Sequence, residues 1–174
     1  MAISKLTVYN FAFFQGAWLA CVMLASPWAL AAVSPFVVIQ LIWGEKWQRD
    51  MRTGISFVLL GALAESFLLG TGSVTIPGQV RDLPPLWLLC LWFCFGISTR
   101  YSLAWLRSFS RYKLLWQVLI SAALAPFAYL GAEKLGAIEL HDNSLISIAV
   151  TWGVILPVCL LVTDREARKN APTA

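Results

Sequence analysis

Six apolar stretches follow one another along this chain, and short polar segments separate them. A helix needs about 20 such residues to cross the hydrocarbon core of a membrane. Because 59% of the 174 residues are hydrophobic and no separate soluble portion remains, we predict a single integral membrane domain over residues 1–174. We expect an all-α polytopic membrane helix bundle of about six transmembrane helices, at Leu6–Ala25, Pro27–Trp43, Thr53–Gly72, Pro85–Leu106, Leu114–Ala132 and Leu145–Val162.

The second stretch is the shortest, and it contains Pro35. It follows the first after a turn at Ser26 and Pro27. The alternative to two full crossings is therefore a helical hairpin that crosses the membrane only in part. We keep six as the predicted number.

The basic residues predict the orientation, because positively charged loops tend to stay on the cytoplasmic side. In a six-span chain one side holds Lys5, Lys46, Arg49, Arg52, Arg107, Arg111, Lys113, Arg165, Arg168 and Lys169, and the other holds only Arg81 and Lys134. Both termini are therefore predicted to be cytoplasmic. Tryptophans favour the headgroup level. They mark the inner boundary at Trp43, Trp47, Trp105 and Trp116, and the outer one at Trp28 and Trp87.

Several function classes are disfavoured by what the sequence lacks. His141 is the only histidine, and it falls in an outer loop. Membrane di-iron enzymes need many histidines, and a helix-held haem usually needs a histidine ligand within the membrane. No zinc, nucleophile-elbow or nucleotide-binding motif occurs. The four cysteines lie inside spans without Cys-x-x-Cys spacing, which indicates packing. We therefore expect no cofactor and no metal. We also expect no nucleic-acid partner, since the basic residues flank membrane spans.

Glu65 is the strongest functional lead. It lies in an otherwise uncharged run from Thr53 to Gly72, and a charge at the bilayer centre costs roughly 2.5–3.5 kcal/mol on insertion scales. Gly54, Gly61 and Gly72 recur around it at helical spacing, and small residues permit close approach between membrane helices. The face that carries Glu65 is therefore predicted to pack inward.

The fifth span offers a partner surface, because it combines small residues with Pro126 and Tyr129, and Glu133 follows one turn later. We predict a polar cavity, open to the outer face, lined by Glu65, Tyr129 and Glu133. Glu65 either transfers protons or, while protonated, joins helices through a hydrogen bond. Two further polar residues lie within spans: Gln15 near the midplane, and Arg100, whose long side chain can extend toward the inner headgroups.

A set of positions along almost the whole chain points to a family. They are Asn10-Phe11, Phe14-Gln15, Trp18, Glu65, Gly72, Pro85-Leu86-Trp87, Leu91-Trp92, Ser102 to Leu106, Ala125-Pro126, Tyr129, Glu133 and Gly136. With these the chain resembles the DUF2878 family of small bacterial inner-membrane proteins of unknown function. The resemblance implies a bacterial inner-membrane location and, from the genes found beside relatives, an association with fatty-acyl-modifying enzymes. It supplies no active site.

Three hypotheses about function follow. The first is an accessory or scaffold in membrane lipid or fatty-acyl modification, which binds membrane lipids or recruits a peripheral or membrane lipid-modifying enzyme through its basic loops. The second is a proton-coupled small-solute transporter, for which an oligomer of six-span chains would suffice. The third is a lipid-modifying enzyme that uses Glu65, Tyr129 and Glu133. The sequence favours a non-enzymatic role, because no nucleophile and base can be assigned.

Overall fold

A computed structural model describes residues 5–43, 47–79, 83–107 and 112–169 of the chain. They form six α-helices: α1 (Lys5–Leu24), α2 (Trp28–Trp43), α3 (Trp47–Gly70), α4 (Leu86–Ser102), α5 (Lys113–Lys134) and α6 (Ser144–Lys169). A 3₁₀ turn, η1 (Ala104–Arg107), follows α4, and two short strands, β1 (Val74–Thr75) and β2 (Glu139–Leu140), pair with each other. The predicted all-α helix bundle is confirmed.

Four of these helices are long and apolar enough to cross a membrane: α1, α3, α5 and α6. The apolar parts of α2 and α4, Trp28–Gln40 and Leu86–Thr99, are shorter. The number of six spans therefore stays a prediction.

The helix boundaries differ most from the predicted spans at α6, which ends at Lys169 instead of Val162, and at α3, which begins at Trp47 instead of Thr53. A hydropathy pattern ends where charged residues begin, but a helix continues through them. Arg49 and Asp50 thereby enter α3, and both are buried.

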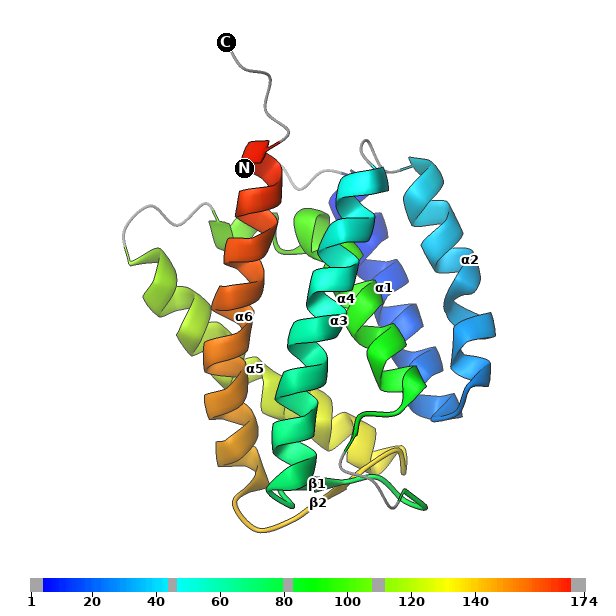
Figure 1. The fold of residues 1–174 in the computed structure, drawn as a ribbon, viewed down its shortest axis with the longest axis vertical. Helices are drawn as coiled ribbons and strands as arrows, with labels where there is room; N and C mark the ends of the chain where they lie inside the picture. Colours follow the sequence, from blue (N-terminus) through cyan, green and yellow to red (C-terminus); the bar gives the residue numbers. More distant parts are fainter. Residues whose placement is uncertain (1–4, 44–46, 80–82, 108–111, 170–174) are drawn as a thin grey trace.

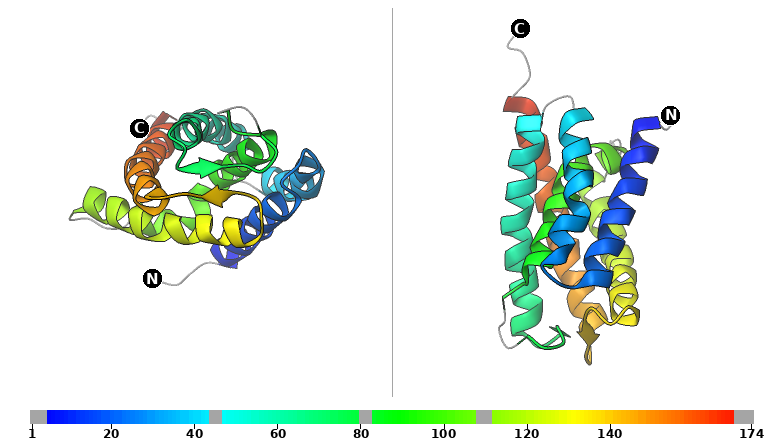
Figure 2. Two further views of the ribbon diagram at one scale, coloured as in Figure 1. Left: turned by 90° about the horizontal axis from the view of Figure 1, so that it is seen from below. Right: turned by 90° about the vertical axis from the view of Figure 1, so that its right-hand side faces the viewer.

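The helices form a chain of neighbours around α4. It packs against α1 on one flank and against α3 on the other, α3 also packs against α6, and α6 packs along α5 (Figure 1). α2 lies outside α1, and α5 runs obliquely to the other helices (Figure 1). At the sheet end, α5 comes back beside α1, where a Cβ at Gly131 would lie 3.3 Å from the ring of Trp18 (Figure 2, left).

Glycines bring α3 and α4 into close contact. A Cβ atom at Gly61 would lie 2.1 Å from Cδ2 of Trp92, and one at Gly54 would lie 2.7 Å from the ring of Phe93. The face that carries Glu65 therefore packs inward, but mainly on α4 and not on the predicted fifth span. Gly72 does not share this face, because α3 ends at Gly70 and Gly72 has a positive φ of 68° in the turn that follows.

The β1–β2 sheet lies across one end of the bundle (Figure 2, left). It joins two segments that the sequence placed in separate outer loops, with Val74 opposite Leu140 and Thr75 opposite Glu139. The Ser144 hydroxyl donates to the carbonyl of Ser73 over 2.5 Å, which fastens the start of α6 to this sheet. The start of α1 and the end of α6 lie at the opposite end (Figure 1). The side of the membrane on which each end lies stays a prediction.

Candidate functional site

Glu65 is the centre of a buried hydrogen-bond cluster built from four helices. Its side chain is 2% exposed. Its Oε1 accepts hydrogen bonds from the Tyr129 hydroxyl of α5 over 2.6 Å and from Trp92 Nε1 of α4 over 3.1 Å. Trp152 Nε1 of α6 donates in turn to the Tyr129 oxygen over 3.2 Å. One carboxyl group therefore ties α3 to α4 and α5, with α6 held through Tyr129.

The direction of every bond in this cluster follows from the chemistry of the groups. An indole N–H can only donate, so Trp152 supplies its hydrogen to the Tyr129 oxygen and Tyr129 supplies its own to Glu65. Both donors converge on Oε1. No hydrogen bond to Oε2 is formed by the described residues.

The second carboxyl oxygen reaches open space. The fully enclosed side-chain polar atoms that lack a partner in the described part of the chain are Asn10 Oδ1, Arg49 Nη2 and Gln117 Nε2. Oε2 of Glu65 is not among them. Since Glu65 also lines a cavity, this oxygen is the acceptor that the cavity offers to a ligand.

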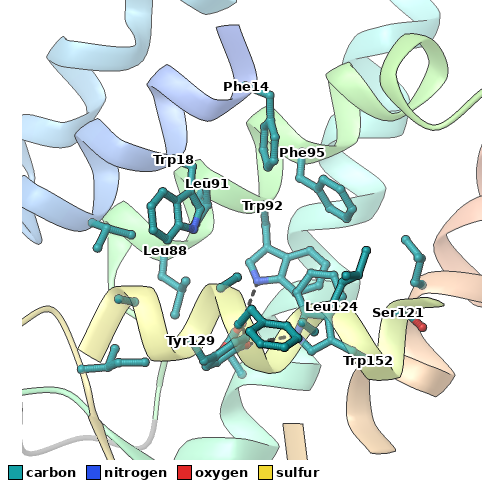
Figure 3. A pocket seen from close by; sticks show the side chains of 18 of the residues that line it. Phe14, Trp18, Leu88, Leu91, Trp92, Phe95, Ser121, Leu124, Tyr129 and Trp152 are labelled. Atoms are coloured by element: carbon teal, nitrogen blue, oxygen red, sulfur yellow. Dashed lines mark hydrogen bonds between the residues drawn. The ribbon is translucent and has the colours of Figure 1, made fainter. Parts of the chain in front are cut away.

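The cavity has a volume of about 490 Å³, which is in the range of small-molecule sites. Trp18 and Phe14 of α1 and Leu88, Leu91 and Phe95 of α4 form one wall, and α5 and α6 form the other (Figure 3). Val74, Ile76 and Ile138 close the end beneath the sheet, and Leu103 and Leu106 lie at the η1 end. The lining is almost entirely apolar or aromatic.

The cavity opens sideways through the bundle surface. Leu124, Phe127 and Trp105 line the cavity and are also 59%, 69% and 44% exposed. Ala128 of α5 lines the cavity and is exposed as well. In a membrane such a surface faces lipid tails.

The structure brings together two of the three predicted cavity residues. Glu65 and Tyr129 are in direct contact, whereas Glu133 is not among the lining residues. Its Oε1 accepts the backbone N–H of Leu140 over 3.1 Å and so supports β2. Gln15 lines the cavity. Arg100 belongs to α4, but its side chain lies outside the described residues.

Sequence reasoning missed the two tryptophans of the cluster. Trp92 and Trp152 stack with ring centroids 5.0 Å apart and an angle of 18° between their planes. A signal existed, because both lie well inside apolar stretches, where an indole N–H needs an acceptor.

The structure corrects the prediction for Trp87. It was predicted to anchor the outer boundary, but it is 3% exposed and lines the cavity. Trp28, by contrast, is 76% exposed.

Comparison with known families gives one match. The family model described as "Protein of unknown function (DUF2878)" matches residues 7–158, from α1 into α6. The chain belongs to the DUF2878 family. No curated protein and no solved structure matches this DUF2878 chain.

The matched range contains the whole cluster, so in this DUF2878 protein the carboxyl group, its donors and the cavity are parts of the family domain. The lining includes no Lys, Arg or His among the described residues. In the same part of the chain, no group of three or more His, Cys, Asp or Glu side chains could hold a metal ion. The arrangement can therefore bind an amphiphile, with apolar walls for its chain and one carboxyl oxygen for a polar group.

Proposed function

We propose that this DUF2878 protein is a multi-pass protein of the bacterial inner membrane that binds a membrane lipid in the cavity beside Glu65. In this role it is an accessory in membrane lipid or fatty-acyl modification, which holds a lipid for a peripheral or membrane lipid-modifying enzyme. The observation that carries the proposal is the apolar cavity of about 490 Å³ that opens sideways between exposed apolar side chains.

The length of the cavity supports the binding of an extended chain. Trp87 and Leu103 line it near its two ends, and their separation along α4 corresponds to roughly 24 Å at the rise of a helix. Trp92 lies nearer the Trp87 end, so the carboxyl cluster leaves the longer apolar part toward η1. An acyl chain that entered through the side opening would replace lipid contacts with contacts to apolar and aromatic walls.

The accessory role draws on the basic residues at the end opposite the sheet. Arg52 and Arg165 are exposed there, and Lys113 forms an ion pair with Asp164 over 3.0 Å. Arg49 does not contribute to this surface, because it is 8% exposed. Lys46 and Arg111 lie outside the described residues. Positive groups at the cytoplasmic side would attract anionic headgroups or an acidic enzyme surface.

The test of lipid binding compares two substitutions on the same helix. Ala128→Phe places a ring in the cavity, whereas Ala123→Phe places the same ring on the exposed face of α5, away from the lining. After mild extraction, native mass spectrometry is expected to detect a lipid retained by the wild type and by Ala123→Phe, and lost from Ala128→Phe. Equal retention by all three proteins would reject the cavity as the lipid site.

The accessory role needs a test in cells. A host lacking the gene is expected to show a missing or accumulating acyl species in its membrane lipids. Expression of the wild type or of Ala123→Phe is expected to restore the acyl profile, whereas expression of Ala128→Phe is expected to leave it altered. An acyl profile that does not change on deletion would reject the role in lipid modification.

One observation favours proton-coupled transport of a small amphipathic solute as a second candidate. The cavity extends from beneath the sheet to η1, and its lining contains a single carboxyl group, that of Glu65, among the described residues. A solute that crossed by this route would pass that group. Uptake into proteoliposomes that follows a pH gradient and disappears in Glu65→Gln would promote transport over the accessory role.

A further inference from the structure

We infer that the ligand of this cavity is an amphiphile with a single positive charge, whose ammonium group binds Oε2 of Glu65 and whose alkyl chain lies along the apolar walls. The inference rests on the proposed function, in which the cavity holds a membrane lipid, and it narrows that lipid to amphiphiles whose only charge is an ammonium group.

The first argument is the charge of the cavity. Glu65 contributes the only ionisable carboxyl group of the described lining, and no Lys, Arg or His side chain lines the cavity to neutralise it. An ionised carboxylate that is buried without an oppositely charged partner is unfavourable, even where it accepts hydrogen bonds. A cationic ligand supplies the missing partner, and its apolar chain fills the space that the walls enclose.

The second argument is that the two carboxyl oxygens of Glu65 differ in their hydrogen bonds. Oε1 already accepts from Tyr129 and Trp92, and these bonds hold the carboxyl group in one orientation. Oε2 accepts nothing from the described residues. An alkylammonium group has three N–H donors and no acceptor, so it matches an oxygen that only needs a donor.

The third argument is the aromatic character of the lining. Nine aromatic side chains line the cavity, and those of Trp92, Tyr129 and Trp152 belong to the carboxyl cluster itself. The negative face of an aromatic ring attracts cations, and tryptophan does so most strongly. Such walls accept an organic cation together with its alkyl chain, whereas the negative ring faces repel an anion.

The same features discriminate among amphiphiles with similar chains. A fatty acid would place a second carboxylate beside Glu65. A zwitterionic aminophospholipid also carries an ammonium group, but its phosphate would find no basic side chain in the described lining. A long-chain primary amine is free of both defects and is the class that we expect to bind best.

The test measures binding of hexadecylamine, hexadecanol and hexadecanoate to the full chain in nanodiscs of a zwitterionic phosphatidylcholine, by quenching of tryptophan fluorescence or by calorimetry. Phosphatidylethanolamine in the nanodisc serves as the competing headgroup source. The amine is expected to bind about tenfold more tightly than the alcohol, because a charge-assisted bond replaces a neutral one. Hexadecanoate is expected to bind most weakly, and phosphatidylethanolamine is expected not to displace the amine.

Substitutions then assign the preference to one residue. Glu65→Gln keeps the size of the side chain and an acceptor for Trp92 and Tyr129, so it is expected to bind the alcohol as the wild type does and to lose the tenfold preference for the amine. Asp142→Asn removes the same charge from an exposed loop residue and is expected to keep that preference. The comparison of ligands on the wild type needs no variant and decides the question even if Glu65→Gln fails to fold.

The outcomes separate this inference from the proposed function. If amine and alcohol bind equally and Ala128→Phe abolishes both, the cavity holds an amphiphile but the ammonium class is wrong. If phosphatidylethanolamine displaces the amine, the phospholipid headgroup is the source of the ammonium group and the assignment to a singly charged amine is wrong. If no amphiphile binds and Ala128→Phe behaves as the wild type does, the proposed function and this inference both fail.

Discussion

On its α3 flank, α4 packs so closely that a single added carbon at Gly61 would lie 2.1 Å from Trp92, whereas on its α5 flank a cavity of about 490 Å³ separates the two helices. Trp92 belongs to both sides: its ring rests on Gly61, and its N–H reaches Glu65 in the cavity wall. The comparison teaches that the tight interface positions the polar group and the loose one leaves room beside it. A rigid α3–α4 pair is what gives the carboxyl group a fixed place in an otherwise apolar space.

The largest expected effect comes from filling the tight flank. In Gly61→Ala the new methyl group overlaps the indole of Trp92, so the ring must leave its place or the helices must separate. We expect a loss of about 3 kcal/mol of stability, at the upper end for overpacked cores, measured as a lower midpoint of thermal unfolding in detergent. Gly16→Ala is the control, because a Cβ at Gly16 meets nothing within 4 Å. Equal midpoints for the two variants would show that α3 and α4 are not held together at Gly61.

The next largest effect is expected at Glu65, whose carboxyl group lies between the α3–α4 interface and the cavity. Glu65→Leu leaves the buried donors of Trp92 and Tyr129 without an acceptor, and unsatisfied buried donors cost about 2 kcal/mol. Glu65→Gln keeps an acceptor oxygen, so its loss is expected to be smaller, about 1 kcal/mol. The measurement is the thermal midpoint and the amount of folded protein in the membrane. A Gln variant as unstable as the Leu variant would mean that the charge, and not the hydrogen bonds, holds the cluster together.

How much of this could be predicted from the sequence differs between the two flanks. The glycine spacing around Glu65 correctly predicted an inward face, because small residues report the distance between helices whatever the partner is. The partner itself, α4, was not predicted, since apolar residues on several spans would have served equally well. Tyr129 was linked to Glu65 only by its position on the fifth span. Trp152 could be recognised as an indole that needs an acceptor, but hydropathy does not show which group accepts its N–H.

Glu133 stays outside the cavity lining for a local reason. It lies one helical turn after Tyr129 within α5, so the two residues share a face of that helix. The predicted fifth span stopped at Ala132 and treated the following residues as a loop. In the structure α5 ends at Lys134 and the chain turns into β2. The backbone N–H of Leu140 in β2 donates a hydrogen bond to the Glu133 carboxyl group, which holds that group away from the cavity. A two-residue strand is too short to leave a pattern in the sequence.

A smaller effect is expected at Tyr129, which couples the cavity wall to α6. Tyr129→Phe keeps the ring and removes one donor to Glu65 and the acceptor of Trp152. Hydrogen bonds between membrane helices average about 0.6 kcal/mol, so we expect a loss near 1 kcal/mol for the two. The indole N–H of Trp152 should also become detectable as an unbonded group in the NMR spectrum of tryptophan-labelled protein. An unchanged Trp152 resonance would contradict the hydrogen bond that joins α5 to α6.

The smallest effect on stability is expected from Ala128→Phe, although it adds more atoms than Gly61→Ala. The two variants therefore compare the α5 flank of α4 with its α3 flank. Ala128 lines the cavity and is exposed, so the ring of Ala128→Phe enters open space. The methyl group of Gly61→Ala, by contrast, overlaps the indole of Trp92. We expect a change within about 0.5 kcal/mol, which is typical of substitutions that disturb no packed contact. Thermal unfolding of Ala128→Phe beside Ala123→Phe measures it. If Ala128→Phe destabilised the protein as strongly as Gly61→Ala does, the α5 flank would be packed and no ligand could occupy it. A stable Ala128→Phe that has lost its bound lipid would instead separate the two roles of α4, since the fold would depend on its tight flank and binding on its open one.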